Sequence, residues 1–324
     1  MTILVTGGAG FIGSHLCEHF LANNHRVICL DNFDDFYNPA IKEQNVAAAL
    51  KNPNYTLVRG DIRDTTVLSD IFEKNAVDCV VHLAAKAGVR PSIEQPVNYV
   101  DVNVNGTITL LEAMRQNGVK RFVFGSSSSI YGNQTKTPFS ETDDVSRPIS
   151  PYAATKHSGE LLAYTYHHLF GMNVACLRFF TVYGPRQRPD LVIHKFTQLA
   201  LADRPIPLYG EGGTRRDYTF VADIVQGISK LIDNQTWRYE IFNLGCGHPV
   251  SLLEMVQAVG QALGEPLKIN YLDKQPGDVE QTHADISKAQ AFFGYQPTVQ
   301  LQEGVRQFVE WYRPNFIDLR FKIT

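Results

Sequence analysis

A glycine-rich loop between a strand and a helix constrains the fold of this chain more than any other segment. Residues 2–6 form an apolar, β-branched run typical of a buried parallel strand, and a helical pattern covers residues 12–24. Gly7, Gly10 and Gly13 join the two. Glycines here allow a tight turn and let backbone amides approach a pyrophosphate, which the helix N-terminus also attracts. Without its flanking elements the triplet would fit an ordinary turn, but in this context it predicts a dinucleotide-binding unit.

The end of the second predicted strand indicates which dinucleotide would bind. This strand covers residues 26–30 and leads into Asp31, where a carboxylate typically accepts hydrogen bonds from the adenosine ribose hydroxyls. Asn32 rather than an arginine follows, so the pattern favours NAD over NADP. The alternative for Asp31, and for Asp61 after the third strand, is a carboxylate that only caps its loop. Further cofactor contacts are expected from Phe11, Ile12, Ile62, Leu83, Ala84, Ala85, Lys86, Asn103, Ser126 and Phe179.

The order of predicted elements indicates the fold class and a division into domains. Strand and helix signals alternate up to about residue 179, which predicts an α/β fold with a Rossmann-type doubly wound parallel sheet. Turn signals then crowd between short helices and predict a smaller C-terminal α/β substrate-binding lid. We expect an NAD-binding domain over 1–180, a mainly substrate-binding domain over 181–314 with some segments able to return to the first, and a tail over 315–324.

Composition argues against several other classes of protein. The 324 residues carry a net charge of −3 and show no basic cluster, so a nucleic-acid partner is not expected. No apolar run approaches the ~20 residues of a membrane helix, and we expect no signal peptide because the first predicted strand begins at residue 2. The five cysteines lack disulfide or metal-ligand spacing. We expect a cytoplasmic protein with reduced thiols, no bound metal and no membrane partner.

Tyr152 and Lys156 are a candidate base and its charge partner. They lie four residues apart in a helix predicted over 151–170, so their side chains share one face. A tyrosine has a pKa near ~10, but the adjacent ammonium and a positively charged nicotinamide would both lower it. Ser127, at the end of a strand over 121–126, would hydrogen-bond the same substrate oxygen. Alone, this spacing also fits two surface residues of a helix, so the surrounding motifs must decide.

Motifs along nearly the whole chain resemble those of extended short-chain dehydrogenases/reductases and, within that group, of nucleotide-sugar 4-epimerases. The resemblance implies that Ser127, Tyr152 and Lys156 are catalytic and that Tyr152 and Lys156 also contact the cofactor. Relatives form homodimers through two helices of each subunit, and the helices predicted over 96–116 and 151–170 are the candidates here. The motifs comprise the glycine loop and segments 81–85, 103–107, 126–132, 151–156, 177–185, 213–218 and 276–278.

The last three of four consecutive serines, residues 126–129, limit which reactions the site could catalyse. Relatives that dehydrate or decarboxylate nucleotide sugars carry an acidic residue in this segment, where the present chain has Ser127, Ser128 and Ser129. The departure argues against both reactions and favours epimerisation at C4. In that reaction Tyr152 would take the hydroxyl proton while NAD⁺ takes the hydride and later returns it, so NAD must stay tightly bound.

The substrate is expected to be UDP-glucuronate, converted to UDP-galacturonate through a transient 4-keto intermediate. Segments 84–90, 188–190 and 275–279 resemble UDP-glucuronate 4-epimerases more than glucose/galactose enzymes. A 4-keto uronate loses CO₂ easily, so hydroxyl donors and an arginine would have to hold its carboxylate. Alternatively, the hydroxyls bind the 6-hydroxyl of UDP-glucose or UDP-N-acetylglucosamine, or the site is a 4-ketoreductase that releases its cofactor. Expected substrate contacts are Arg90, Ser127, Ser128, Ser129, Tyr152, Thr181, Arg188, Arg216 and Asp278, with Arg216 at the nucleotide diphosphate.

Overall fold

A parallel sheet of seven strands forms the centre of the protein. The computed structural model describes residues 1–210, 212–273 and 280–316. The strands follow the order β11-β6-β5-β4-β1-β2-β3, and each neighbouring pair is parallel. Their bounds are β1 (Thr2–Thr6), β2 (Arg26–Asp31), β3 (Tyr55–Arg59), β4 (Cys79–His82), β5 (Arg121–Ser127), β6 (Asn173–Phe179) and β11 (Tyr239–Leu244).

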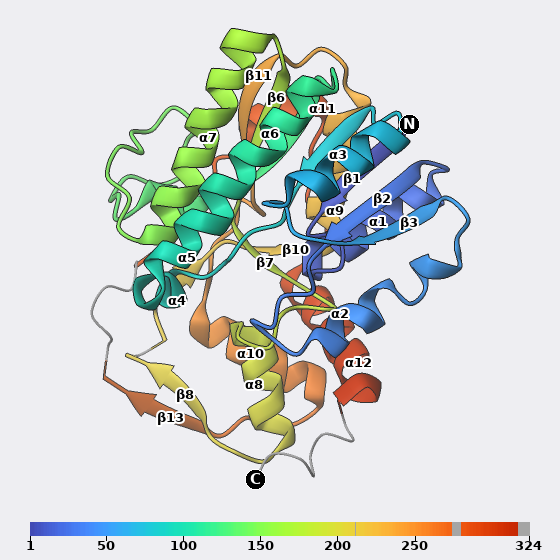
Figure 1. Cartoon of the computed structure of the whole chain (residues 1–324). Helices are drawn as coiled ribbons and strands as arrows, with labels where there is room; N and C mark the ends of the chain where they lie inside the picture. Colours follow the sequence, from blue (N-terminus) through green and yellow to red (C-terminus); the bar gives the residue numbers. More distant parts are fainter. Residues whose placement is uncertain (211, 274–279, 317–324) are drawn as a thin grey trace.

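Helices cover both faces of this sheet, which confirms the predicted doubly wound α/β fold (Figure 1). Along β1, Ile3 and Val5 join one apolar core, whereas Leu4 between them joins the core on the opposite face. Since both faces of the sheet are covered, side chains on both sides of β1 are buried, and this explains why its sequence is apolar without alternation. The first core contains α1 (Phe11–Ala22) and α9 (Val221–Asp233), and the second contains α3 (Thr65–Lys74), α6 (Gly106–Gln116) and α7 (Pro151–Phe170).

Shorter elements from the second half of the chain form a smaller lobe next to the carboxyl ends of the central strands (Figure 1). In the part of the chain that the structure describes, three strand pairs lie outside the main sheet, β10 with β7, β12 with β9 and β13 with β8. Bounds here are β7 (Thr181–Tyr183), α8 (Val192–Leu201), β8 (Ile206–Tyr209), β9 (Arg215–Arg216), β10 (Tyr218–Phe220), β12 (Val250–Ser251), α10 (Leu252–Leu263), β13 (Ile269–Leu272), α11 (Ser287–Phe293) and α12 (Leu301–Phe316). None of the described helices is long and apolar enough to span a membrane.

Some of the observed helices and strands cross the predicted domain boundaries. β11 falls in the range 181–314 but pairs with β6 of the main sheet, and α9 packs against α1. α12 also runs on to Phe316, inside the range predicted as a tail. A two-domain division stays a prediction, with the segment from α9 to β11 returning to the first unit.

The helix predicted over 96–116 is divided by a π-helical turn. Three pieces replace it: α5 (Pro96–Val100), the π turn η2 (Asp101–Asn105) and α6. The turn carries the buried Asn103, whose side chain hydrogen-bonds outside its own helix. Such turns interrupt helices where a side chain must be redirected, which periodicity does not reveal. The remaining elements are α2 (Pro39–Val46), η1 (Ala49–Lys51), α4 (Val89–Glu94) and η3 (Ser128–Tyr131).

Candidate active site

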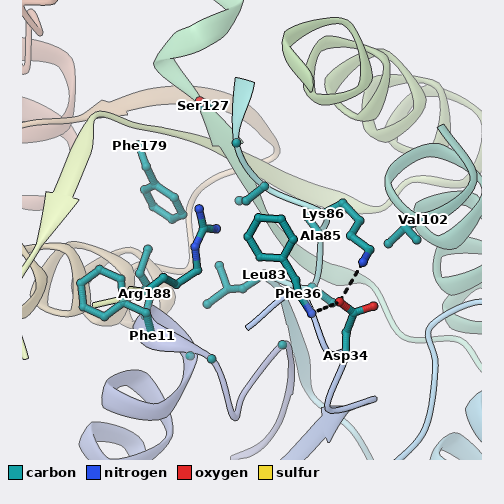
Figure 2. Close-up of a pocket in the computed structure, with 18 of the residues that line it drawn as sticks. Phe11, Asp34, Phe36, Leu83, Ala85, Lys86, Val102, Ser127, Phe179 and Arg188 are labelled. Carbon is teal, nitrogen blue, oxygen red and sulfur yellow. Dashed lines mark hydrogen bonds and ion pairs between the residues drawn. The ribbon is translucent and has the colours of Figure 1, made fainter. Parts of the chain in front are cut away.

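A cavity of about 520 Å³ lies at the carboxyl ends of the central strands, where open parallel sheets bind ligands (Figure 2). Loops after β1, β2, β3, β4 and β5 line it together with α7 and the segment after β6. Of the predicted cofactor contacts, those that line it are Gly7, Gly10, Phe11, Ile12, Gly13, Asp31, Asn32, Asp61, Ile62, Leu83, Ala84, Ala85, Lys86, Ser126, Tyr152, Lys156 and Phe179.

The backbone of the glycine loop leaves no room for a side chain at Gly7 or Gly13. Gly7 has a φ of +69°, and a Cβ atom there would lie 2.8 Å from the backbone nitrogen of Ala84. A Cβ atom at Gly13 would lie 2.2 Å from the carbonyl oxygen of Gly7. α1 begins after Gly10, and no side chain caps its N-terminus. Its first amides are therefore available to an anion, as a dinucleotide pyrophosphate requires.

Asp31 is held more tightly than the sequence indicates. Its carboxylate accepts hydrogen bonds from the backbone amides of Ala9 (3.1 Å) and Phe33 (2.9 Å), so part of the loop-capping alternative is correct. It also forms a buried ion pair with Lys42 of α2, with 3.0 Å between Nζ and Oδ1. Lys42 lines the same cavity, and sequence reasoning missed it because it lies in a different element from Asp31. At an adenosine ribose site, the pair offers both an acceptor and a donor.

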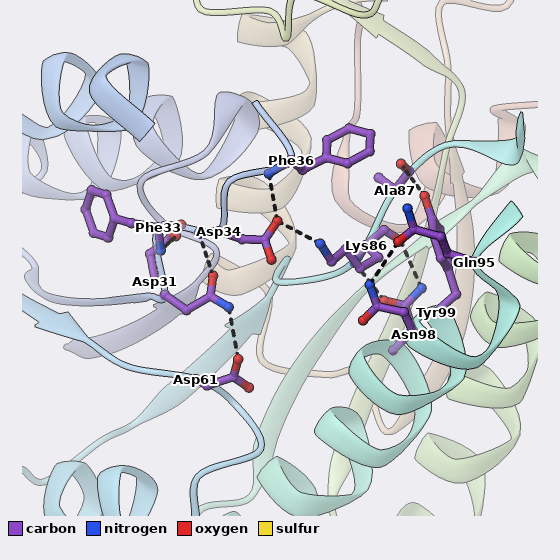
Figure 3. A network of polar contacts seen from close by, with 12 residues as sticks. Asp31, Phe33, Asp34, Phe36, Asp61, Lys86, Ala87, Gln95, Asn98 and Tyr99 are labelled. Carbon is purple, nitrogen blue, oxygen red and sulfur yellow. Dashed lines mark hydrogen bonds and ion pairs between the residues drawn. The ribbon is translucent and has the colours of Figure 1, made fainter. Parts of the chain in front are cut away.

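Asp61 belongs to a polar chain along the β3 edge of the cavity. Its carboxylate accepts a hydrogen bond of 2.9 Å from Asn32 and an ion pair of 2.8 Å from Arg63. The hydrogen bonds from Arg63 lower the pKa of Asp61 to about 2. Asp61 is therefore ionised at neutral pH and anchors the loop after β2 (Figure 3).

Asn103 lies behind the cavity wall instead of in it. Its Oδ1 accepts a hydrogen bond of 2.8 Å from the backbone amide of Lys86, and its Nδ2 donates to the Lys86 carbonyl at 3.0 Å. The same nitrogen donates to Thr155 of α7 at 3.0 Å. The structure thus places this predicted cofactor contact as a support that ties Lys86 to α7.

The N-terminus of α7 presents Tyr152 and Lys156 to the cavity. Ser150 caps this helix by accepting a hydrogen bond of 3.1 Å from Ala153, and Pro151 occupies the first turn. The Lys156 ammonium is buried and donates to the carbonyl of Gly125 in β5 at 2.7 Å. Tyr152 and Lys156 therefore sit at the carboxyl end of β5, in the same cavity as the three serines.

The pKa of Tyr152 differs from the sequence expectation. Burial raises it above the ordinary tyrosine value, although a hydrogen bond with Ser127 and the charge of Arg188 act in the opposite direction. Burial also lowers the pKa of Lys156 to about 8, with the Glu160 carboxylate opposing that shift. The expected decrease for Tyr152 is therefore not produced by the protein groups alone, because Lys156 is directed at Gly125 and burial dominates.

The predicted substrate residues fall into two groups. Ser127, Ser128, Ser129, Thr181 and Arg188 line the cavity together with Tyr152. Among the described residues, Arg90 is exposed at the start of α4 and Arg216 lies on β9, and neither lines the cavity. The Arg216 guanidinium donates instead to the backbone carbonyl of Arg215 at 2.9 Å. Asp278 lies outside the described residues.

The loop after β2 contributes cavity residues that sequence reasoning missed. Asp34, Phe36 and Tyr37 line the cavity, and Figure 2 shows Phe36 close to Arg188. The Arg188 guanidinium lies 5.4 Å from the centre of the Phe36 ring and forms two hydrogen bonds of 2.9 Å with Asp190. The aromatic residues Phe33, Phe36 and Tyr37, shortly after Asp31, are the sequence feature that could have identified this loop as part of the cavity.

Comparison with known proteins places this geometry among enzymes that act on nucleotide sugars. Residues 4–308 match the model of a family described as GDP-mannose 4,6 dehydratase. The chain is 41% identical over 313 residues to the UDP-glucuronate 4-epimerase of Thermodesulfobacterium geofontis, covering 96% of each. It resembles the crystal structure of Bacillus cereus UDP-glucuronic acid 4-epimerase in complex with UDP-glucuronic acid and NAD, with a TM-score of 0.91 at 36% identity over 97% of this chain and 100% of that one. The crystal structure of UDP-glucose 4-epimerase from Thermotoga maritima aligns with a TM-score of 0.89 at 32% identity. The alignment covers 98% of this chain and 100% of that one.

Proposed function

The chain belongs to the family described as GDP-mannose 4,6 dehydratase, within the extended short-chain dehydrogenases/reductases, and from this membership we propose that it is an NAD-dependent 4-epimerase of UDP-glucuronate. The product is UDP-galacturonate. One observation favours epimerisation over the dehydration in the family's description. Among the described residues, the carboxylates that line the cavity are Asp31 at the end of β2, Asp34 after β2 and Asp61 after β3, whereas the segment after β5 contributes serines to the cavity that Tyr152 lines.

The residues of the cavity fit a dinucleotide. The amides of the glycine loop and of the first turn of α1 would receive the pyrophosphate, and Asp31 with Lys42 would meet the adenosine ribose. Lys86 would lie beside the phosphates, held through its backbone by Asn103. When bound, NAD would supply the hydride acceptor for C4 of the sugar in its oxidised form and the hydride donor in its reduced form.

Tyr152 acts as the base and acid at the C4 oxygen. Ser127 lines the same cavity as Tyr152, donates its hydroxyl to Ser129 at 3.1 Å, and is placed to share the substrate oxygen with Tyr152. The positive charge of Arg188 favours the phenolate, and Lys156 adds a second cation behind the site. Loss of this proton and of the C4 hydride would give the 4-keto sugar, which would turn about its diphosphate linkage, and Tyr152 would return the proton when a hydride is added to the opposite face.

A carboxylate clamp keeps the intermediate from losing CO₂. Ser128, Ser129 and Thr181 line the cavity and offer neutral hydroxyl donors, and Arg188 offers the guanidinium N–H groups that do not donate to Asp190. A carboxylate fixed in the plane of the neighbouring carbonyl has no overlap between its breaking C–C bond and the carbonyl π system. Arg90, Arg216 and Asp278 remain predicted contacts of the sugar or nucleotide.

The substrate is tested by incubating the purified protein separately with UDP-glucuronate, UDP-glucose and UDP-N-acetylglucosamine. NMR measures C4 inversion and CO₂ release. We expect C4 inversion of UDP-glucuronate without CO₂ release, and no steady release of NADH. Inversion of the two neutral sugars alone would overturn the carboxylate clamp. Net NADH formation would indicate an oxidoreductase, and Tyr152→Phe that retains full activity would overturn the catalytic assignment.

A homodimer is proposed from the exposed face of α5 and α7, which pack side by side (Figure 1). Val97 of α5 is 80% exposed and Leu161 of α7 is 57% exposed, and apolar residues in such positions favour a partner. Light scattering should give twice the 36.3 kDa of one chain, and Leu161→Glu should give a monomer. Leu50→Glu, at an exposed leucine of η1, is the matched control.

A cytoplasmic location is proposed from the cysteines. All five are free thiols, and four of them are buried. Thiols persist in this state in a reducing compartment. Fractionation of the producing cell tests the location, and recovery of the protein outside the cytoplasm would contradict it.

A further inference from the structure

Residues 32–38, between β2 and α2, form a strap that crosses one side of the cavity (Figures 2 and 3). We propose that Asp34 in this strap is a positioning residue that holds Lys86 and closes the strap over the bound dinucleotide, so that the cofactor is retained from one turnover to the next. The inference rests on the proposed function, because only a cofactor that is regenerated inside each cycle must remain bound throughout.

Asp34 joins the strap to the loop after β4. Its Oδ1 accepts a hydrogen bond of 2.7 Å from the Lys86 ammonium and one of 3.0 Å from the backbone amide of Phe36 (Figure 2). The two charged side chains are only 29% and 15% exposed. Burial by itself raises the pKa of Asp34, but the hydrogen bonds from Lys86 and Phe36, together with the lysine charges, outweigh burial and hold the pKa below its ordinary value. A partly buried, charge-assisted contact of this kind is stronger than a surface ion pair.

Both partners of this contact are anchored elsewhere. On the Lys86 side, the backbone is fixed by Asn103, which also bonds Thr155 of α7. On the Asp34 side, the backbone amide donates to Asn32 at 3.1 Å, and Asn32 donates to Asp61 at 2.9 Å (Figure 3). The Asp34–Lys86 pair therefore joins two loop segments that are each hydrogen-bonded to neighbouring elements, one to Asp61 after β3 and the other to Asn103 of η2.

Phe36 extends the strap toward the substrate end. Its ring lies 5.8 Å from the Lys86 ammonium and 5.4 Å from the Arg188 guanidinium, within range of a cation–π interaction in both cases. Loss of the Asp34 charge would remove the attraction for the Lys86 ammonium, whereas an asparagine Oδ1 could still accept from the amide of Phe36. The expected consequence is faster dissociation of the cofactor, because the strap must open before the dinucleotide leaves, with little change in the chemical step.

The test measures release of NAD from the full-length protein. Wild type, Asp34→Asn and Asp35→Asn are loaded with NADH, and the decay of bound NADH fluorescence is followed after dilution into excess NAD⁺. Asp35 is the matched control, an exposed carboxylate next to Asp34. We expect release at least about tenfold faster from Asp34→Asn, a ratio equivalent to 1.4 kcal/mol, and a wild-type rate from Asp35→Asn. Equal rates for the two variants would overturn the proposal.

A second arm tests whether Asp34 acts through Lys86. In a Lys86→Met background, which removes the partner charge, Asp34→Asn should cause no further acceleration. Independent, additive effects of the two substitutions would overturn the positioning role. If wild-type protein binds no NAD at all, the proposed function fails and this inference with it. If wild-type protein retains NAD and Asp34→Asn retains it equally well, only the strap assignment fails.

Discussion

Glu160→Gln is predicted to destabilise the protein strongly although it changes only one functional group. Glu160 of α7 and Arg178 of β6 form an ion pair whose side chains are 3% and 2% exposed. The Arg178 guanidinium donates to both carboxylate oxygens, at 3.0 and 2.9 Å, and the Ser126 hydroxyl donates to one of them at 2.6 Å. Glutamine preserves the shape but leaves the guanidinium without a buried counter-charge.

The size of the effect follows from burial. Removing one partner of a buried ion pair costs about 3–5 kcal/mol, because the remaining charge stays out of water. The glutamine amide also adds two N–H donors where three donors already converge, so at least one donor loses its partner. With an unfolding entropy of about 2.1 cal/mol/K per residue, the melting temperature of this 324-residue chain shifts by about 1.5 °C per kcal/mol, which gives a decrease of roughly 4–7 °C.

The assay is thermal unfolding at saturating NAD, with Glu43→Gln as the matched control. Glu43 and Arg59 form the same two-pronged contact at 2.8 and 2.7 Å, but their side chains are 46% and 53% exposed. Glu43→Gln should melt within error of wild type. Glu160→Leu with Arg178→Met should be more stable than Glu160→Gln, because no charge remains buried. A Glu160→Gln variant as stable as Glu43→Gln would refute the reasoning.

Three further outcomes are expected. Gly13→Ala should lose cofactor binding in a titration, because its Cβ would lie 2.2 Å from the Gly7 oxygen, whereas Gly213→Ala, with no atom within 4 Å, should bind normally. Burial lowers the pKa of His194 from 6.5 to about 4, so the unfolded state binds more protons between those pH values. Stability should therefore fall by up to roughly 3 kcal/mol as the pH drops through that window, and a stability curve with the same slope in His194→Phe would contradict this. Asp31→Asn should release the Lys42 charge for a 2′-phosphate and raise affinity for NADP relative to NAD, and the gain should vanish when Lys42→Met is added.

The bounds of helices and strands could be predicted from the sequence where residues close together in the chain determine them. α7 has the predicted bounds, and α1 (Phe11–Ala22) agrees within two residues with the helix predicted over 12–24, because a serine cap and glycine punctuation act over a few residues. The helix over 96–116 was predicted as continuous, and the π turn at Asn103 depends on a hydrogen bond to Lys86 from another loop.

The sequence by itself determined the parallel α/β fold, the glycine cradle, the spacing of Tyr152 and Lys156, and a serine segment without a carboxylate. Each of these is a local pattern whose consequence does not depend on what packs against it. Only the tertiary structure decided that Lys42 neutralises Asp31, that Asp34 reaches Lys86, and that burial raises the pKa of Tyr152. The physical reason is that ion pairing and desolvation depend on which side chains the folded chain brings together and how completely it removes them from water.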